Sequence, residues 1–256
     1  MVFCFRVAYN HVQDEGVKYQ DDRGEWKMDH FALLSEERRG NALIVGIPQS
    51  AFPSPQAVSW AVSGGGFAIP RVIVNHSIDA HERIEDCAAY ARSFLEGEEL
   101  PKESIIMLTS VHQRFQGIAD LCSGTDTFAV RTYATVGLGN ALAAGDPVDA
   151  VSKQCGTINL IVVVAGTLSA EACLECISVV TEAKTRFFRE KEIISVSSGE
   201  TATGTGTDCV VIVSLGVGDH IAYVGSHTEE GSLIARSVID AMRKSYDLRF
   251  SQFTGI

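Results

Sequence analysis

The chain has 256 residues, of which 46% are hydrophobic and 21% are charged, a composition typical of folded globular proteins rather than disordered ones. Its 32 acidic and 21 basic side chains give a formal charge of -11 at pH 7. Because such a charge repels phosphate backbones and anionic lipid headgroups, we expect neither nucleic acid nor a membrane as a partner.

The first half of the chain is predicted to consist mainly of strands and loops. Short runs of apolar and β-branched residues predict strands over residues 2–7, 43–47, 68–75, 105–110 and 126–135. The polar stretch 21–25 is typical of a hairpin or loop, and the prolines and glycines of residues 48–66 predict a longer loop-rich segment. Asp79 is predicted to cap the start of a helix, with Glu82 at capping-box spacing, and Gly97 is predicted to end it.

The second half of the chain alternates between predicted strands and helices. Buried strands are predicted over residues 158–165 and 210–213, and helices over residues 169–189 and 232–245. Ser169 is the expected cap of the first of these helices. Strands and helices mixed in this order indicate an α/β (α+β) fold, in which helices are layered on a mixed β-sheet. No repeat or boundary divides the chain, so we predict a single domain over residues 1–256.

Seven cysteines are scattered along the chain, which fits a reducing compartment better than a framework of disulfides. The longest apolar run, residues 158–168, is interrupted by Asn159 and is shorter than the ~20 residues that span a bilayer, and no secretory signal is recognisable. We therefore expect a cytoplasmic protein. Cys173 and Cys176 share the apolar stripe of a predicted helix, so they are expected to be core residues rather than metal ligands or a redox pair.

The segment from Gly199 to Asp208, called here the threonine–glycine segment, has the most unusual pattern in the chain. Four threonines, at positions 201, 203, 205 and 207, alternate with Ala202, Gly204, Gly206 and Asp208. In an extended conformation the bare glycine face would allow a ligand or another backbone to come close. In a loop the N–H groups would form an anion-binding nest, and a glycine-bulged turn with surface threonines is a third open interpretation. The endings of a P-loop and of a dinucleotide fingerprint are absent.

Lys184 interrupts the apolar stripe of the helix predicted over residues 169–189. At ~100° per residue its side chain falls on the buried face, whereas Glu182 points to solvent. A lysine in such a position must reach the surface, pair with a carboxylate or lose its charge, and Asp208 is the candidate partner. An ion pair that ties the helix to the sheet and a catalytic amine both remain open.

Two histidines are candidates for acid–base chemistry. Ser226 and Glu229 have capping-box spacing, which predicts that His227 lies in the first turn of a helix, where the helix dipole favours a neutral imidazole. Gly231 favours a later start of that helix, in which case His227 is a surface residue. His112 follows a predicted strand, a common place for site residues in α/β proteins, although a lone histidine is more often structural.

The sequence contains neither the Gly-x-Ser-x-Gly elbow of serine hydrolases nor the His-Glu-x-x-His helix of zinc hydrolases, so these general catalytic motifs do not indicate a reaction. Blocks in a fixed order are more informative: Gly64-Gly65-Gly66, the strand ending at Asn75, and the segments 135–140 (TVGLGN), 156–159 (GTIN), 181–184 (TEAK), 202–208 (ATGTGTD) and 225–228 (GSHT). In these blocks, which lie within residues 43–245, the chain resembles the adenosylcobinamide amidohydrolases. Cys155 stands where proline is expected, and Ser226 where threonine is expected.

The resemblance implies a hydrolase of corrinoid salvage that cleaves the amide between the propionate arm of the corrin ring and aminopropanol. The cobalt in this reaction belongs to the substrate, so no separate cofactor or metal is expected. A small-molecule corrinoid is the implied partner, and self-association into a homo-oligomer is left open. A non-catalytic corrinoid- or nucleotide-binding protein is the competing hypothesis, and a small-molecule phosphotransferase is a third.

The resemblance does not assign catalytic residues, so their roles are hypotheses. An unactivated amide requires a nucleophile, stabilisation of the oxyanion and a proton for the leaving amine. We expect Asp208 or His227 to activate water, and Asn159 with backbone N–H groups of the threonine–glycine segment to hold the oxyanion. Thr157 is the rival, direct nucleophile. The residues expected to bind substrate are Gly65, Asn75, Asn140, Lys184, Thr203, Gly204, Thr205, Gly206 and Thr207.

Overall fold

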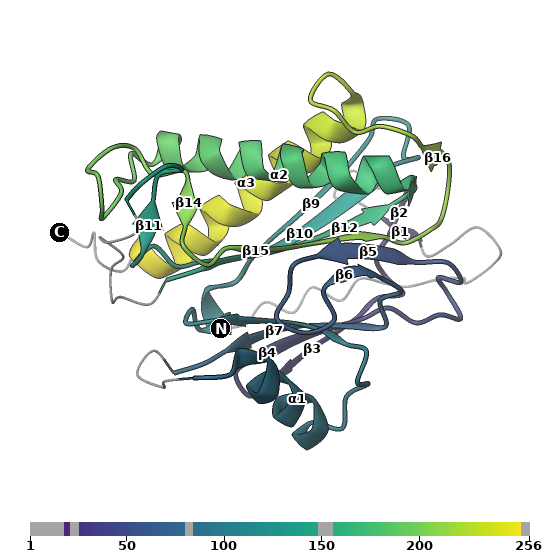
Figure 1. Cartoon of the computed structure of the whole chain (residues 1–256). Coiled ribbons are helices and arrows are strands. Elements are labelled where there is room, and N and C mark those ends of the chain that lie inside the picture. The colour runs from purple at the N-terminus through teal and green to yellow at the C-terminus, as the bar shows by residue number, and fades with distance from the viewer. Residues whose placement is uncertain (1–17, 21–25, 80–83, 148–155, 252–256) are drawn as a thin grey trace.

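Four layers are stacked in the computed structural model, which describes residues 18–20, 26–79, 84–147 and 156–251 (Figure 1). Two long helices cover one face of a six-stranded sheet. The other face of that sheet packs against a four-stranded sheet, whose outer face is covered by a short helix. The predicted α/β (α+β) class is confirmed, with two mixed sheets in place of one, and the assignment of residues 1–256 to a single domain stays a prediction.

The six-stranded sheet has the most deeply buried strand of the described chain near its centre. Its strands, in spatial order, are β6 (Gly66–Ala68), β5 (Gln56–Ser59), β15 (Cys209–Ser214), β12 (Ile158–Ala165), β10 (Ala129–Val136) and β9 (Gly117–Cys122). β12 and β15 run parallel, and the other neighbours are antiparallel. All residues of β12 are buried, because helices cover one side and the second sheet covers the other, which explains why every residue except Asn159 is apolar.

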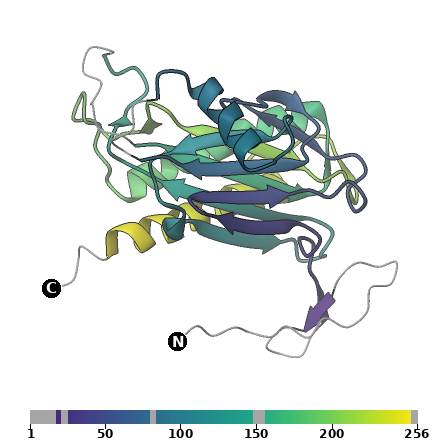
Figure 2. The same ribbon diagram turned by 90° about the horizontal axis from the view of Figure 1, so that it is seen from below.

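The second sheet comes from the first half of the chain. Its strands, in spatial order, are β3 (Ser35–Arg39), β4 (Ala42–Gly46), β7 (Val72–Ser77) and β8 (Ile105–Thr109). β7 and β8 are parallel, and helix α1 (Cys87–Gly97) lies between them in sequence. Seen from below in Figure 2, α1 lies across this sheet, and it buries Ala91 and Leu95 against the outer face.

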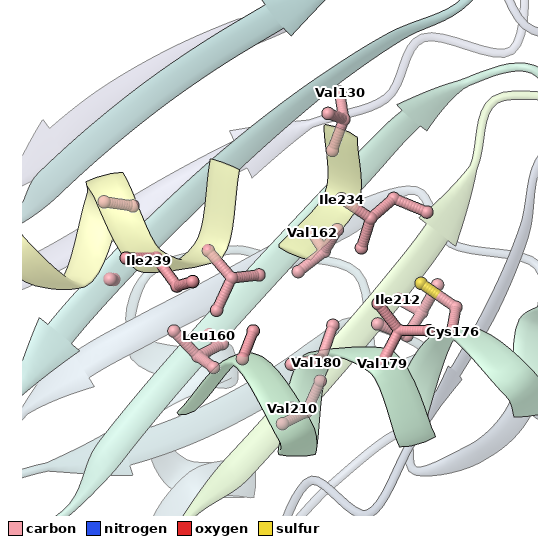
Figure 3. Close-up of a cluster of buried hydrophobic side chains, with 14 of the residues drawn as sticks. Val130, Leu160, Val162, Cys176, Val179, Val180, Val210, Ile212, Ile234 and Ile239 are labelled. Atoms are coloured by element: carbon pink, nitrogen blue, oxygen red, sulfur yellow. The ribbon is translucent and has the colours of Figure 1, made fainter. Parts of the chain in front are cut away.

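Helices α2 (Ala170–Glu190) and α3 (Glu229–Phe250) form the layer over the six-stranded sheet. The buried side chains labelled in Figure 3 come from both helices and from β10, β12 and β15: Cys176, Val179, Val180, Ile234, Ile239, Val130, Leu160, Val162, Val210 and Ile212. Each fully buried Val, Leu or Ile side chain contributes roughly 1.5–3 kcal/mol to folding. α2 begins where predicted, because Ser169 Oγ accepts a hydrogen bond from the Ala172 N–H at 3.0 Å.

Three short ladders and one 3-10 helix complete the described secondary structure. The ladders pair β1 (Lys18–Gln20) with β2 (Trp26–Met28), β11 (Ala141–Leu142) with β14 (Gly204–Thr205) and β13 (Thr167–Leu168) with β16 (His220–Ile221), and the 3-10 helix η1 spans Gln113–Phe115. The β11–β14 ladder holds the threonine–glycine segment in place. None of the described helices has the length and apolar character needed to cross a membrane.

Two of the predicted elements are wrong. The helix predicted to start at Asp79 begins at Cys87, where Asp86 is the N-cap and its Oδ1 accepts a hydrogen bond from the Ala89 N–H at 2.9 Å. The loop-rich segment predicted over residues 48–66 contains β5 and the first residue of β6. β9 was not predicted, and the last helix is longer than expected at both ends. The strand predicted over 2–7 and the hairpin over 21–25 lie outside the described residues.

The described cysteines fall into a buried and an exposed group. Cys173, Cys176 and Cys209 are buried, whereas Cys87 and Cys122 are exposed. Burial raises the pKa of the Cys176 thiol and raises the pKa of Cys209 to about 12. Because the thiolate is the reactive form, we expect iodoacetamide at about pH 8 to alkylate Cys87 and Cys122 in the native protein and the buried group only after denaturation. Peptide mass spectrometry would read the sites, and native alkylation of Cys176 would contradict its place in the core.

Candidate active site

The first residues of β12 and β15 lie at one edge of the six-stranded sheet, because these strands run parallel and side by side. Asn159 of β12 is level with Cys209 of β15, so Thr157 and Asp208, which come just before the two strands, reach the same edge. Helix α2 connects the strands and brings Lys184 to this edge as well. Its Nζ lies 2.5 Å from Asp208 Oδ2, so the predicted ion pair is present.

The carboxylate of Asp208 is held by four donors. Oδ2 accepts hydrogen bonds from Lys184 Nζ and, at 3.0 Å, from the Thr205 N–H. Oδ1 accepts from the Thr205 hydroxyl at 2.5 Å and from the Ile158 N–H at 3.1 Å. A carboxylate has about four acceptor positions, so all of them are occupied. With side chains only 8% and 13% exposed, Asp208 and Lys184 form a fixed, nearly buried ion pair.

The bare face of Gly204 lies directly against this ion pair. A Cβ atom on Gly204 would lie 2.5 Å from Asp208 Oδ2 and 2.7 Å from Lys184 Nζ, closer than any side chain tolerates. The extended part of the threonine–glycine segment is limited to Gly204 and Thr205, which pair with Leu142 and Ala141. In the structure, therefore, the glycine at this position makes room for the ion pair itself.

Thr157 and Thr207 form a pair of hydroxyls beside the Lys184–Asp208 ion pair. Thr157 Oγ1 donates to the Thr207 carbonyl at 2.6 Å, and Thr207 Oγ1 lies 2.8 Å from Thr157 Oγ1 and 2.9 Å from the Gly156 carbonyl oxygen. Among the described residues, no carboxylate, imidazole or amine is hydrogen-bonded to the Thr157 hydroxyl. We call Lys184, Asp208, Thr205, Thr157 and Thr207 together the strand-start cluster.

Asn159 faces the other way, into the seam between the two sheets. Its Nδ2 donates to Asn75 Oδ1 at 2.8 Å and to the Leu108 carbonyl at 3.0 Å, and Asn75 Nδ2 donates to Thr135 Oγ1 at 3.2 Å. Asn159 and Asn75 are almost completely buried. In this arrangement both amide hydrogens of Asn159 are used, so none is free to stabilise an oxyanion, and the two asparagines join the sheets.

The remaining residues expected to bind substrate lie around the cluster in different settings. The buried side chain of Asn140 occupies the space beside Gly156, where a Cβ atom would lie 2.6 Å from Asn140 Oδ1. Thr203 Oγ1 accepts a hydrogen bond from the Ala144 N–H at 3.0 Å. Gly65 lies between β5 and β6, and the structure gives no contact that joins it to the strand-start cluster among the described residues.

Trp60 is a residue of this site that sequence patterns did not indicate. Its indole N–H donates to the backbone carbonyl of Asp208 at 2.7 Å, while 49% of the residue is exposed. The contact arises because β5 pairs with β15, with Ser59 opposite Val211. Since β5 was itself missed, only the presence of a tryptophan next to the Gly64–Gly66 block could have suggested it.

His227 does not join the cluster. Helix α3 begins at Glu229, with Thr228 as N-cap accepting from the Gly231 N–H at 2.9 Å, so the prediction that Ser226 caps the helix is wrong. His227 is exposed, and the neighbouring Ser226 donates to Glu182. Glu182 and Lys184 are two residues apart on α2 and so point to opposite sides of that helix. No described hydrogen bond or ion pair links His227 to Asp208. His112 caps the short helix η1 by accepting from the Arg114 N–H.

A family model described as adenosylcobinamide amidohydrolase matches residues 38–252, a range that includes the whole strand-start cluster and Trp60. The chain belongs to this family. Members of the family are hydrolases that cut an amide C–N bond, and the chain is therefore a hydrolase of this type. The resemblance seen in the sequence blocks is confirmed.

Individual relatives agree with the family. An uncharacterised protein of Methanocaldococcus jannaschii is 32% identical over 204 residues, which cover 70% of this chain and 79% of the relative. The adenosylcobinamide amidohydrolase of Methanosarcina mazei is 25% identical over 203 residues, covering 76% of this chain and 91% of the relative. Among solved structures, a β-aminopeptidase of Burkholderia sp. aligns over 83% of this chain and 80% of its own with 12% identity and a TM-score of 0.44, too low for a functional conclusion.

Within the described residues, no group of three or more His, Cys, Asp or Glu side chains is arranged to hold a metal ion. The polar groups gathered at the strand-start cluster are an ammonium, a carboxylate and three hydroxyls, which can transfer protons and form hydrogen bonds.

Proposed function

We propose that the chain hydrolyses adenosylcobinamide at the amide between the propionate arm of the corrin ring and aminopropanol, within corrinoid salvage. The products are adenosylcobyric acid and 1-aminopropan-2-ol. The observation that carries this proposal is the family match over residues 38–252, together with a relative that bears the activity in its name over 91% of its length. The strand-start cluster supplies the polar groups that amide hydrolysis needs.

In this proposal Lys184 is the group that assists departure of the amine and stabilises the oxyanion. An ammonium has three N–H donors, and among the described residues one of them is used, by Asp208. A second donor can bind the carbonyl oxygen of the substrate as negative charge develops, and a proton can pass to the leaving nitrogen. Asp208 also orients Lys184, through a carboxylate that is itself fixed by three further donors.

The attacking group in this proposal is water. Its oxygen bonds to the carbonyl carbon while its proton passes to Asp208, the C–N bond breaks, and the amine leaves with a proton from Lys184, which Asp208 then reprotonates. The contacts of Thr157 support this choice over direct attack by its hydroxyl, since they include no base among the described residues. Activation of the water by Asp208 requires one of its four donors to give way when substrate binds. The position of His227 gives it no part in this step.

The choice between water and Thr157 predicts a small effect of removing the threonine hydroxyl. We expect Thr157→Val, which keeps the shape of the side chain, to retain kcat within about tenfold, the loss expected for one neutral hydrogen bond. Thr207→Val is the matched control, because it removes the partner hydroxyl of the same pair. Rapid quenching followed by intact-protein mass spectrometry checks the mechanism. A covalent adduct in the native enzyme that disappears only in Thr157→Val would show that Thr157 attacks.

The proposed function itself is tested by incubating the purified protein with adenosylcobinamide in the dark. We expect free 1-aminopropan-2-ol, measured after amine derivatisation, and adenosylcobyric acid, measured by chromatography, to appear in equal amounts. Binding of the corrinoid without release of aminopropanol would overturn the proposal and leave a non-catalytic corrinoid-binding protein.

A further inference from the structure

Exposed apolar side chains gather on the β5–β6 hairpin next to the strand-start cluster. Trp60, Val62, Phe67 and Ile69 lie within ten positions of one another and are 49%, 40%, 59% and 66% exposed. They are four of the ten large hydrophobic side chains that are exposed in the described part of the chain. Apolar patches of this kind on a soluble surface mark places where another apolar surface binds.

The sheet register gives Trp60 and Phe67 a common side. Phe67 pairs directly with Val58, and Val58 belongs to the buried core beneath the helices. Side chains two residues apart in an extended segment point the same way, so Trp60 follows Val58 on this side. β6 is the edge strand of the sheet, beyond the strands that α2 covers. Phe67 therefore extends the helix-facing side of the sheet beyond the strands that α2 contacts, and Trp60 lies beside it at the end of β5.

Trp60 differs from the other exposed side chains because one end of it is fixed. Its indole N–H is bonded to the carbonyl oxygen of Asp208, the residue whose carboxylate holds Lys184. The ring is thereby held beside the strand-start cluster with much of its surface open. An aromatic ring that is already oriented loses little conformational entropy when a ligand packs on it, which favours binding.

We propose that Trp60 is the platform on which the corrin ring of the substrate packs, with Phe67 extending the apolar surface. This inference rests on the function proposed above. A corrin ring is a broad, largely apolar macrocycle with amide arms on its rim, and its face opposite the adenosyl group is the one that can pack on Trp60. A ring packed on Trp60 places its rim beside the Asp208 backbone, so the arm that bears the scissile amide reaches Lys184. The platform thus explains how a small polar cluster selects an amide attached to a macrocycle.

The test compares Trp60→Ala and Trp60→Phe with the native enzyme. Equilibrium dialysis in the dark uses adenosylcobyric acid as the probe, because it keeps the ring and has no aminopropanol amide to be cut. We expect Trp60→Ala to weaken its binding by about tenfold, a typical effect of losing an aromatic stacking partner, and to raise KM for adenosylcobinamide by a similar factor while kcat changes little. Trp60→Phe, which keeps a ring and loses the N–H, should recover most of the affinity.

Tyr223→Ala is the matched control, because Tyr223 is a more exposed aromatic residue that follows β16, outside the strand-start cluster. The affinity of Tyr223→Ala for adenosylcobyric acid and its KM for adenosylcobinamide should equal those of the native enzyme. As a second measurement, the native protein should lose tryptophan fluorescence saturably on titration with adenosylcobyric acid. The loss should be smaller in Trp60→Phe, which retains Trp26.

Unchanged affinity in Trp60→Ala overturns the platform, and so does a fall in kcat that Trp60→Phe does not recover, since that pattern means that Trp60 only braces Asp208. The two proposals fail separately. Release of aminopropanol with no effect of Trp60 on binding removes the platform alone. Ring binding that depends on Trp60 without release of aminopropanol removes the proposed reaction alone.

Discussion

Replacing Lys184 by methionine is expected to reduce kcat for amide hydrolysis by about a thousandfold, the upper end of the loss seen when one oxyanion donor is removed. Methionine keeps the apolar stem that crosses the face of α2 but has no N–H to offer the substrate. Asp208 retains its bonds from Thr205 and Ile158, so its carboxylate stays in place. The measurement is the rate of aminopropanol release at saturating adenosylcobinamide.

The partner change, Asp208→Asn, should affect stability as well as rate. It leaves the ammonium of Lys184 nearly buried without its carboxylate, and breaking such a pair from one side costs roughly 3–5 kcal/mol in the free energy of unfolding. The double variant Lys184→Met with Asp208→Asn should lose less than the sum of the two single losses, because the pair acts as a unit. Urea denaturation of the native protein, the two single variants and the double variant measures the four free energies of unfolding that this double-mutant cycle needs.

Lys191→Met is the matched control for Lys184→Met. Lys191 directly follows the same helix, its ion pair with Asp247 at 3.3 Å has side chains that are 28% and 63% exposed, and its Nζ lies 4.6 Å from the centre of the Tyr246 ring. A partly exposed ion pair contributes about 0–1 kcal/mol and an exposed cation–π contact about 0.5–1 kcal/mol, so stability should fall by at most about 2 kcal/mol and kcat should stay close to native. If Lys184→Met released aminopropanol at the native rate, Lys184 would have no chemical role and its pair with Asp208 would be purely structural.

Gly204→Ala is expected to disable the site without removing any polar group. The added methyl would lie 2.5 Å from Asp208 Oδ2 and 2.7 Å from Lys184 Nζ, and the carboxylate cannot yield freely because four donors hold it. The ion pair must then separate. Displacing catalytic groups by about 1 Å costs about a hundredfold in rate, and crowding of this kind costs about 1–3 kcal/mol in stability. Enzyme assays and thermal denaturation measure the two effects.

Two other glycines provide controls. A Cβ on Gly206 would lie 3.4 Å from Leu142 Cδ1 and 3.6 Å from Asn140 Nδ2, which are ordinary contact distances, so Gly206→Ala should change stability by no more than about 0.5 kcal/mol. At Gly124 a Cβ would meet nothing within 4 Å, and Gly124→Ala should leave both stability and rate unchanged. Native activity in Gly204→Ala would mean that the ion pair can separate without consequence.

Local sequence determines some elements of this fold and not others. β12 could be predicted to the residue because its eight positions are buried on both sides and, apart from Asn159, are apolar. α2 could be predicted because Ser169 caps it and its apolar stripe is long. β5 could not be predicted, because it is a strand of only four residues, bounded by Pro55 and Trp60. It is extended because it pairs with β15.

The first residue of α1 could not be predicted for a different reason. Asp79 and Asp86 are both acceptable N-caps by residue type, and Glu82 completed a capping box for the first. The helix begins after Asp86, whose Oδ1 accepts a hydrogen bond from the Ala89 N–H, and it buries Ala91 and Leu95 against β4, β7 and β8. The segment offers two cap signals of similar strength, and residue type alone does not choose between them.

Some features of the candidate site could likewise be predicted from the sequence, and others could not. The Lys184–Asp208 pair could be predicted because helical phase alone places a charged side chain on a buried stripe, where it requires a partner. The contacts of Asn159 and Trp60 could not be predicted, because each depends on strands that are distant in sequence. Asn159 contacts β7 across the seam between the sheets, and Trp60 reaches the site because β5 pairs with β15. His227 was placed by a capping pattern that Thr228 satisfies instead.

The hydrogen bond between Asn75 and Asn159 has a consequence for how such chains diverge. Two apolar sheet faces can slide past one another at little cost, because dispersion contacts are nearly as good in a shifted position. A hydrogen bond between two buried amides permits one alignment, and each amide left unpaired costs about 1–3 kcal/mol. The pair therefore keeps the sheets in alignment, and descendants of this chain should replace both asparagines together or neither.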